Sequence, residues 1–508
     1  MTFFFLQLLL PVALSFSFIF FSVYLLVLGF QYYRQYSGQN PPTYPLLGCL
    51  ISFCKNMHRL LDWYTDLLAK SPTQTVTIAR FGATRTIVTA NPENVEYILK
   101  TRFDNFPKGK PFTEILGDFL GRGIFNVDGE EWYTQRKLAS HVFSTRSLRE
   151  YVAITLETEV NRRLLPLLER VCLDEGVVDL QDLLRRFALD TVCLVSLGKD
   201  PACLHPSFPA SPLASAFDVA SEISARRAAA PVYALWKAKR VLGIGSEKRL
   251  REAIDQVHDS VIKLIRFRKA ERDDKREDKD LLSRLISGGH DEEVIRDMVI
   301  SFIMAGRDTT SAALTWFFWL ISCLPDIEKQ IVKELAETTV APTEEGSLDY
   351  DGLKEMTTLE ACLCESMRLY PPVAWDSKHA MSHDRLPDGT IVAKGDRVTY
   401  FPYGMGRMER LWGKDWKEFK PTRWLESPEG GVSRVSPYKF PVFQAGPRVC
   451  LGKEMAFVQM KYVAASVLRK FEIRLISPRQ PVFVPLLTAY MAGGLKVRIY
   501  KRGKDKEI

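Results

Sequence analysis

The hydrophobic pattern is most continuous at the start of the chain, where the first 33 residues carry no charged side chain. Pro11 interrupts this run, and the segment from Val12 to Phe30 would form about 28 Å of helix at about 1.5 Å per residue. That length matches a hydrocarbon core of about 30 Å. A cleaved signal peptide would show a basic N-terminal region and a small-residue cleavage site, and neither is evident. The pattern predicts a single-pass transmembrane signal anchor over residues 1–33.

A proline-rich segment, Asn40–Gly48, follows the apolar run. Its three prolines favour an extended, stiff spacer, so we expect a hinge over residues 34–48. Length alone would allow about three domains, but no linker divides the rest of the chain. We therefore expect one catalytic domain over residues 49–508. The first charge after the apolar run is Arg34, which favours a cytosolic exit from the membrane.

Periodicity in the remaining chain predicts a mainly helical domain with a small β region. The longest helix should begin at Asp291, whose side chain can cap it, and end before Pro325, which cannot continue a helix. Its middle is apolar on nearly all sides, so it should cross the core. The pattern predicts helices over 183–197, 291–324 and 453–468, a hairpin from 74–78 and 84–89, and an aromatic-rich pocket loop over 103–128.

Two segments carry polar or reactive residues at positions where the hydrophobic pattern would favour apolar ones. Ala305–Thr310, Ala-Gly-Arg-Asp-Thr-Thr, lies in the middle of the long helix, and such residues in a buried helix indicate a local opening for a ligand. Phe443–Gly452 ends just before a helix, and its Cys450 would have a thiolate favoured by the helix dipole. Such a cysteine can be a nucleophile, a metal ligand or an inert buried residue.

Composition narrows the classes of function. The chain has 508 residues, 46% of them hydrophobic, and a net charge of +8 without runs of basic residues alone. Nucleic acid is therefore not an expected partner, whereas an acidic protein or membrane surface is. Nine cysteines without a regular spacing indicate free thiols in a reducing compartment.

The motif Phe-x-x-Gly-x-Arg-x-Cys-x-Gly at 443–452 resembles the haem-binding loop of the cytochrome P-450 superfamily, the haem-thiolate monooxygenases. The resemblance implies the fold of that family and haem b, with Cys450 as the metal ligand. Ala305–Thr310 resembles its oxygen-binding segment, which implies that Asp308 and Thr309 deliver protons during catalysis. The implied cofactor-binding residues are Trp132, Arg136, Lys378, Arg448 and Cys450.

A further part of the resemblance concerns structure rather than chemistry. Glu365 and Arg368, three residues apart on a helix, can form an ion pair. They resemble the Glu-x-x-Arg motif of the family, which a downstream arginine completes, and Arg423 is the candidate. The segment 484–494 resembles the C-terminal hairpin whose tip enters the pocket near Leu487.

The sequence as a whole most resembles the plant branch of this superfamily that hydroxylates the terminal region of fatty acids and of jasmonoyl-isoleucine. The resemblance implies a lipid-like carboxylate substrate, an NADPH–cytochrome reductase partner and a catalytic domain on the cytosolic side of the endoplasmic reticulum membrane. No residue distinguishes the two substrates, and candidates for binding the carboxylate are Lys108, Lys110, Arg226 and Arg227. An isomerase or dehydratase acting on lipid hydroperoxides and a haem sensor remain alternatives, although neither needs Asp308 and Thr309.

Overall fold

The computed structural model describes residues 18–24, 27, 41–204, 211–270, 280–338, 348–425, 431–477 and 479–503. Most of the predicted membrane anchor, Val12–Phe30, lies outside these ranges; residues 18–24 are helical. Among the described residues, no single helix has both the length and the apolar composition needed to cross a membrane. A bent pair, Glu292–Ser322 with Pro325–Thr338, meets both criteria together.

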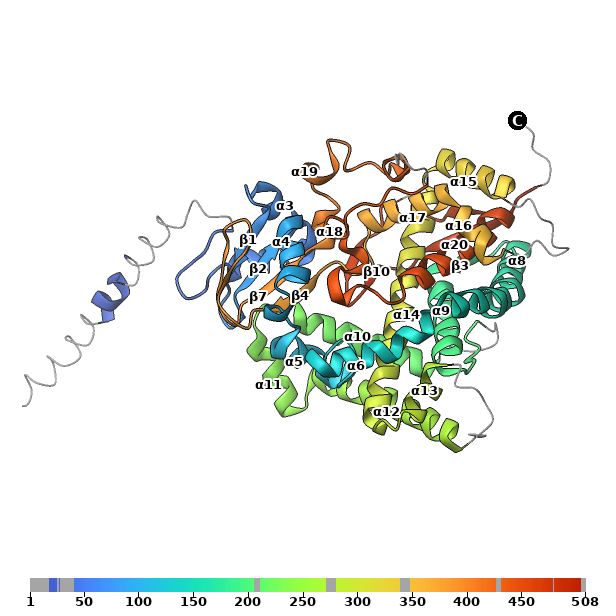
Figure 1. The fold of residues 1–508 in the computed structure, drawn as a ribbon. Helices are drawn as coiled ribbons and strands as arrows, with labels where there is room; N and C mark the ends of the chain where they lie inside the picture. Colours follow the sequence, from blue (N-terminus) through green and yellow to red (C-terminus); the bar gives the residue numbers. More distant parts are fainter. Residues whose placement is uncertain are drawn as a thin grey trace, which may run out of the picture.

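Helices make up most of the molecule, as the periodicity predicted (Figure 1). They are α2 Leu50–Lys55, α3 Leu60–Lys70, α4 Pro92–Glu96, α5 Gly109–Leu120, α6 Gly129–Ser140, α7 Thr145–Glu150, α8 Leu165–Leu173, α9 Leu180–Leu197, α10 Pro212–Ala228, α11 Tyr233–Leu242, α12 Gly245–Ala270, α13 Leu281–Ser287, α14 Glu292–Ser322, α15 Pro325–Thr338, α16 Tyr350–Glu355, α17 Thr357–Leu369, α18 Pro402–Met405, α19 Glu409–Trp412 and α20 Lys453–Lys470. A long π-helical stretch, Tyr151–Leu164, precedes α8.

The strands form four small sheets. They are β1 Thr75–Ile78, β2 Thr86–Thr89, β3 Val177–Asp179, β4 Asp376–His379, β5 Asp384–Arg385, β6 Ile391–Val392, β7 Arg397–Tyr400, β8 Phe471–Leu475, β9 Phe483–Pro485, β10 Ala489–Met491 and β11 Lys496–Lys501. The largest sheet has the order β1-β2-β7-β4, and only the β2–β7 pair is parallel. It lies at one side of the molecule, away from the helical body (Figure 1).

The long helix α14 runs through the helical body, where it packs against α9, α17 and α20 (Figure 1). Its side chains from Ala312 to Phe318 are buried, because its middle is apolar on all sides. The helix begins at Glu292, but the side chain of Asp291 makes no capping hydrogen bond, so the predicted cap was wrong. Pro325 ends the pattern as predicted and starts α15.

Two segments differ from the sequence-based expectation. The predicted loop at 103–128 contains the helix α5, whose Ile115, Leu116, Phe119 and Leu120 form one buried face. The predicted extended spacer does not continue to its end, because Tyr44 and Gly48 exchange backbone hydrogen bonds of 2.9 and 2.8 Å across a tight turn. Gly48 has a φ of 58° and packs against the carbonyl of Ala79, which leaves no room for a side chain.

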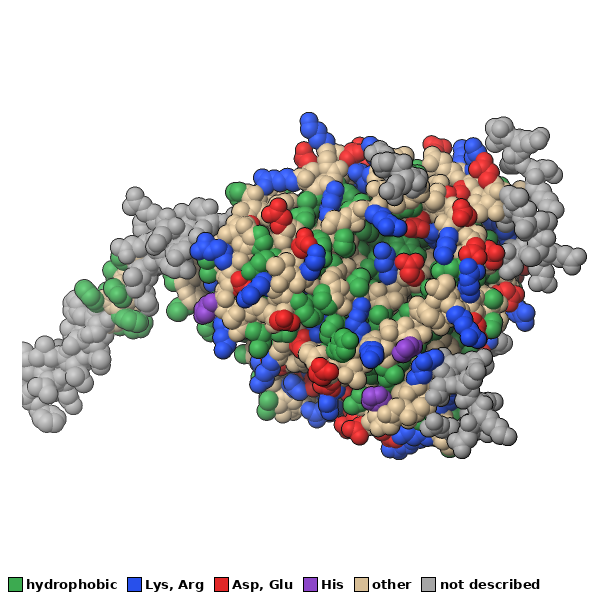
Figure 2. Space-filling model, viewed as in Figure 1, with side chains coloured by type: hydrophobic (Ala, Val, Ile, Leu, Met, Phe, Trp, Pro, Cys, Tyr) green, Lys and Arg blue, Asp and Glu red, His purple; other side chains and the backbone are tan. Residues whose placement is uncertain are grey.

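The surface carries charges of both signs. On the face shown in Figure 2, Lys and Arg side chains are interspersed with Asp and Glu, and apolar side chains lie between them.

Candidate active site

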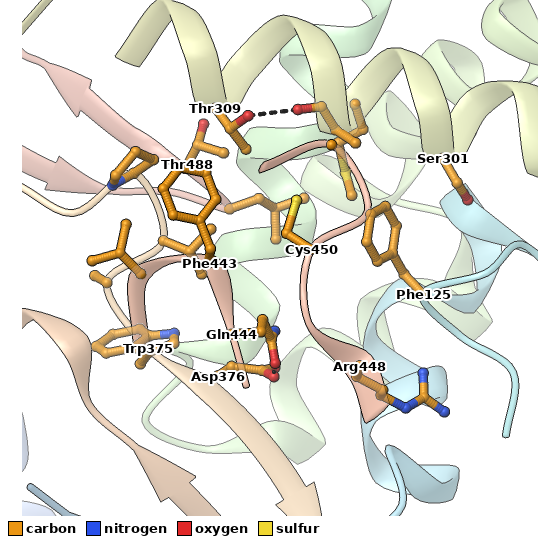
Figure 3. A pocket seen from close by; sticks show the side chains of 18 of the residues that line it. Phe125, Ser301, Thr309, Trp375, Asp376, Phe443, Gln444, Arg448, Cys450 and Thr488 are labelled. Carbon is orange, nitrogen blue, oxygen red and sulfur yellow. Dashed lines mark hydrogen bonds between the residues drawn. The ribbon is translucent and has the colours of Figure 1, made fainter. Parts of the chain in front are cut away.

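A cavity of about 450 Å³ lies in the interior between α14, the 443–452 loop and the β9–β10 hairpin. Most of its lining is apolar, and the side chains shown in Figure 3 come from elements far apart in the sequence. The hairpin tip, Leu486–Thr488, lines the cavity, as the sequence predicted. An apolar enclosure of this size is typical of a binding site for a cofactor or an organic substrate.

Cys450 projects its sulfur into this cavity, with Thr309 on the opposite wall (Figure 3). The loop is held by a hydrogen bond of 2.8 Å from the Cys450 N–H to the Phe443 carbonyl. Gly446 has a φ of 66° and packs against the Leu99 carbonyl, so a side chain there would clash. Helix α20 begins three residues after the cysteine. Cys450 is accessible because it lines the cavity, although it lies deep in the protein.

The groups around Cys450 shift the pKa of its thiol in opposite directions. Burial raises the pKa of Cys450, while the Gly452 N–H, Arg136 and Lys453 act to lower it. Burial favours the neutral thiol, whereas the Gly452 N–H and the two cationic side chains favour the thiolate, the form that binds a metal ion. Cys450 is therefore placed as a metal ligand, with donors ready to stabilise the charged sulfur.

Trp132 and Arg136 lie on one face of α6, as their spacing predicted, and both line the cavity. Arg136 Nη2 donates a 2.7 Å hydrogen bond to the Val449 carbonyl, next to the cysteine. The Arg448 guanidinium lies 4.6 Å from the Trp132 ring centroid and pairs with Asp128 Oδ1 at 2.7 Å. Three of the predicted cofactor-binding side chains are thus brought together beside the loop.

Lys378 lies in β4, buried beside Asp376, but it does not line the cavity. Its Nζ is 3.4 Å from Asp376 Oδ2 and makes no hydrogen bond within the described part of the chain. Burial lowers the pKa of Lys378 to about 7, although Asp376 opposes the shift. An added anion nearby would raise this pKa and satisfy the ammonium group.

Asp376 is the centre of a polar cluster that the sequence did not reveal. Lys108 Nζ lies 2.6 Å from Asp376 Oδ1, and the Tyr400 hydroxyl donates to Oδ2 at 3.0 Å. Gln444 of the cysteine loop also donates to Oδ2, at 3.0 Å. Burial acts to raise the pKa of Asp376, but Lys108 and Lys378 together hold it well below its usual value. The cluster ties β4 and β7 to the cysteine loop.

The two residues of the predicted proton-delivery pair face different sides of α14. Thr309 lines the cavity, and its hydroxyl donates a 2.6 Å hydrogen bond to the Ala305 carbonyl (Figure 3). Asp308 is buried and does not line the cavity. Its Oδ1 lies 3.4 Å from Arg307 and 3.8 Å from Arg185. Burial raises the pKa of Asp308, and the two arginines oppose that rise.

The predicted buried network is complete. Arg368 donates two hydrogen bonds of 2.8 Å to the Glu365 carboxylate, one to each oxygen. Arg423 and Trp424 each add another, at 2.9 and 2.8 Å. Arg368 also bonds the carbonyls of Gly406 and Trp416. The network joins α17 to the segment that leads to the cysteine loop, so it positions the site without touching the cavity.

Sequence reasoning missed most of the cavity wall. Phe302 and Trp375 line the cavity, and no local pattern separates them from ordinary core residues, whereas Phe125, which also lines it, lies in the predicted pocket loop. Of the four candidates for binding the carboxylate, only Lys108 lines the cavity, and Asp376 already pairs with it. Lys110 and Arg226 are exposed, and neither lines the cavity.

Arg227, the remaining candidate, is buried and paired. It forms ion pairs with Glu247 and, at 2.8 Å, with Asp118. Its side chain is 3% exposed, so it holds α10 against α5 and α12 rather than offering a free charge. The predicted location of the carboxylate anchor was therefore wrong for Arg227.

The arrangement fits an iron porphyrin. A cavity-facing thiol supplies one axial ligand, and an apolar enclosure suits the macrocycle. The porphyrin carboxylates would require cationic donors, and Lys378, buried just behind the lining residues Ser377 and His379, has a side-chain nitrogen without a hydrogen-bond partner in the described residues. Arg136, Trp132 and Arg448 add donors at the cavity wall.

Comparisons with known proteins agree with this geometry. The Cytochrome P450 family model matches residues 39–490. The chain is 60% identical over 476 residues to cytochrome P450 94B1 of Arabidopsis thaliana, covering 92% of both chains. It is 57% identical to cytochrome P450 94B3 of the same plant, covering 91% of this chain and 92% of the relative. It is 47% identical to cytochrome P450 94A1 of Vicia sativa, covering 91% and 90%. The chain belongs to the cytochrome P450 family.

Proposed function

We propose that this P450 monooxygenase hydroxylates the terminal region of a carboxylate-bearing aliphatic substrate, jasmonoyl-isoleucine or a fatty acid, with O₂ and NADPH-derived electrons. The observation that carries the proposal is that Cys450 and Thr309 line the same largely apolar cavity (Figure 3). A flexible hydrocarbon chain buries its apolar surface in such an enclosure, and its free end can reach the space above the sulfur.

Haem held by the Cys450 sulfur would supply the activation of O₂. The protein side chains then control access and protons. Phe125, Phe302 and Leu487 line the cavity, where they hold the substrate chain and exclude water. Trp132, Arg136, Lys378 and Arg448 are the proposed partners of the haem carboxylates.

Thr309 is the proposed proton donor inside the cavity. Its hydroxyl donates to the Ala305 carbonyl and can turn toward a developing negative charge, because a single C–O rotation redirects it. Asp308 is the proposed source of the proton. It lies beside Arg185 and Arg307, which both pair with the partly exposed Asp218, so this cluster connects the buried acid to the surface. Asp308 must change its rotamer to reach the cavity side of α14.

The proposed enzyme is attached to a membrane and receives its electrons from a separate protein. Residues 1–33 form the membrane anchor, residues 34–48 link it to the catalytic domain at 49–508, and that domain lies on the cytosolic side of the endoplasmic reticulum membrane. An NADPH–cytochrome reductase supplies electrons. The basic excess of the chain, +8, favours docking to an acidic protein surface.

Turnover in membranes tests this proposal. The full chain would be expressed with a plant NADPH–cytochrome reductase and given jasmonoyl-isoleucine and dodecanoic acid in parallel. We expect NADPH- and O₂-dependent products hydroxylated at or near the chain end. Conversion of a lipid hydroperoxide without NADPH would instead identify an isomerase or dehydratase. Haem binding with neither reaction would favour a sensor.

A further inference from the structure

Two arginines that line the cavity away from the cysteine loop, Arg80 and Arg397, have no carboxylate partner among the described residues. Arg80 follows β1, and Arg397 is the first residue of β7. The Arg397 side chain makes no hydrogen bond within the described chain, and its buried Nε is without a partner. Its guanidinium lies 5.7 Å from the Tyr233 ring centroid. Nη1 of Arg80 donates to the backbone carbonyls of Ala230 and Pro231, at 3.1 and 3.4 Å.

Lys108 and Arg448 of the cavity wall already have carboxylate partners, Asp376 and Asp128. Arg136 has none, but it donates to the Val449 carbonyl beside Cys450, where it is a proposed partner of the haem carboxylates. A buried or half-buried guanidinium without an anion loses solvation that nothing in the protein restores. Arg80 and Arg397 are thus the cations of this wall that a bound anion can still satisfy.

The two arginines lie at the same end of the cavity. Arg80 bonds the carbonyls of Ala230 and Pro231, and the Arg397 guanidinium lies over the ring of Tyr233, two residues further along the chain. Tyr64 lines the cavity as well, together with Phe53 and Leu60 of the N-terminal helices. Arg80 stacks on Phe53, with 3.8 Å between the guanidinium carbon and the ring centroid. This end of the cavity therefore combines apolar side chains with two cationic groups.

This end is remote from the sulfur. The other end of β7, Tyr400, bonds Gln444 of the cysteine loop through its hydroxyl, at 2.5 Å. Arg397 is three residues away along the strand, about 10 Å at about 3.3 Å per residue. A substrate bound by its acid at Arg397 would extend its chain along the sheet toward Cys450.

We propose that Arg397, assisted by Arg80, binds the carboxylate of the substrate and so sets which carbon reaches the haem. This proposal rests on the proposed function. It assigns the binding of the substrate carboxylate to two residues that the sequence analysis did not name. The guanidinium fork of Arg397 can make two parallel hydrogen bonds to a carboxylate. The neighbouring His379, the cross-strand partner of Arg397, does not compete for the anion, because burial and Arg397 keep it neutral.

Equilibrium binding tests the anchor with dodecanoic acid and its methyl ester. The haem-loaded full chain would be titrated by the spin-state change of its Soret band and by calorimetry. We expect wild-type protein to prefer the acid, and Arg397→Gln to weaken acid binding about 10- to 100-fold while ester binding changes little. Arg80→Gln should have a smaller effect in the same direction. Arg397→Lys should restore part of the acid preference.

Arg85→Gln is the matched control. Arg85 lies beside the same sheet, but its side chain pairs with Asp396 at 3.2 Å and does not line the cavity. The Arg85→Gln variant should prefer dodecanoic acid over its methyl ester as strongly as the wild type does. The CO spectrum of each reduced variant checks that haem and fold are intact.

Regiochemistry provides a second readout. With the anchor removed, hydroxylation of dodecanoic acid should spread from the chain end to interior carbons, because the chain can slide. If Arg397→Gln and Arg80→Gln both keep the acid preference and the terminal product, the anchor proposal is wrong while the proposed function stands. If the wild-type enzyme hydroxylates neither dodecanoic acid nor jasmonoyl-isoleucine, the proposed function itself has failed.

Discussion

At the scale of single residues, the chemistry depends on two side chains that face one cavity. Burial raises the pKa of the Cys450 thiol, and the Gly452 N–H, Arg136 and Lys453 act in the opposite direction, toward the charged form. The Thr309 hydroxyl is held by the Ala305 carbonyl one turn earlier in α14. Each of these residues can be changed without disturbing a buried ion pair.

Replacing Cys450 by Ser should abolish the long-wavelength Soret band of the reduced CO complex. A thiolate donates electron density to iron, and a neutral hydroxyl does not replace it. Difference spectra of the CO complex measure the band directly. Cys323→Ser is the control, because Cys323 is exposed and does not line the cavity. A variant at Cys450 that retained the band would refute the ligand assignment.

Replacing Thr309 by Ala should preserve haem binding and divert NADPH consumption to peroxide. Without its hydroxyl, the cavity side of α14 loses the proposed proton donor at this position. Product formed per NADPH consumed, measured with peroxide release, checks the expectation. Thr315→Ala on the same helix is the control, since Thr315 is buried and bonds the Ser311 carbonyl away from the cavity. Equal coupling in both variants would exclude a proton-delivery role.

At the scale of elements, the Glu365 network holds α17 against the segment before the cysteine loop. Glu365 and Arg368 have no exposed side-chain surface. Burial of an ion pair is costly, and the cost is offset here because both carboxylate oxygens accept several hydrogen bonds. Breaking such a pair leaves an uncompensated buried charge.

Glu365→Gln should therefore destabilise the protein by about 3–5 kcal/mol. The neutral amide leaves the buried Arg368 guanidinium without an anion, whereas Arg423 keeps its pair with Asp415. Thermal unfolding and the rate of haem loss measure the effect. Glu337→Gln is the control, because its pair with Lys333 spans 3.8 Å on the surface of α15 and should contribute little. A melting temperature unchanged in Glu365→Gln would contradict the structural role.

At the scale of the whole molecule, buried groups couple stability to pH. His379 is 4% exposed, and its Nδ1 lies 2.6 Å from the Lys108 carbonyl. Burial lowers the pKa of His379 to about 4, and Arg397 contributes in the same direction. In the unfolded chain its pKa is about 6.5. Between these values the unfolded state binds more protons, so stability falls as pH falls through this window.

His379→Asn should make the protein less sensitive to acid between pH 6.5 and 4. An asparagine can keep a hydrogen bond to the Lys108 carbonyl but takes up no proton. The wild type should lose up to about 3 kcal/mol more stability than the variant across this window. Melting temperatures at a series of pH values measure the difference. The exposed His141, changed to Asn, is the control. Parallel pH profiles for wild type and His379→Asn would contradict the expectation.

Local patterns predicted much of this fold because their causes are local. The hairpin β1–β2 follows from alternation of β-branched residues, and α14 and α20 follow from helical periodicity. Helix α5 escaped prediction because Gly109, Pro111 and Gly117 weaken its propensity. Burial of its Leu116 face in the core outweighs that cost, and Pro111 is tolerated in the first turn.

The sequence by itself determined the cysteine loop, the Ala305–Thr310 segment and the Glu365–Arg368 pair, because each depends on spacings of a few residues along one element. Only the tertiary structure decided which charges are free. Arg227 meets Glu247 and Asp118, and Lys108 meets Asp376, through contacts between distant parts of the chain. Arg397 remains without a carboxylate among the described residues. Whether a charge is solvated, paired or left for a ligand depends on three-dimensional proximity, which short-range spacing does not encode.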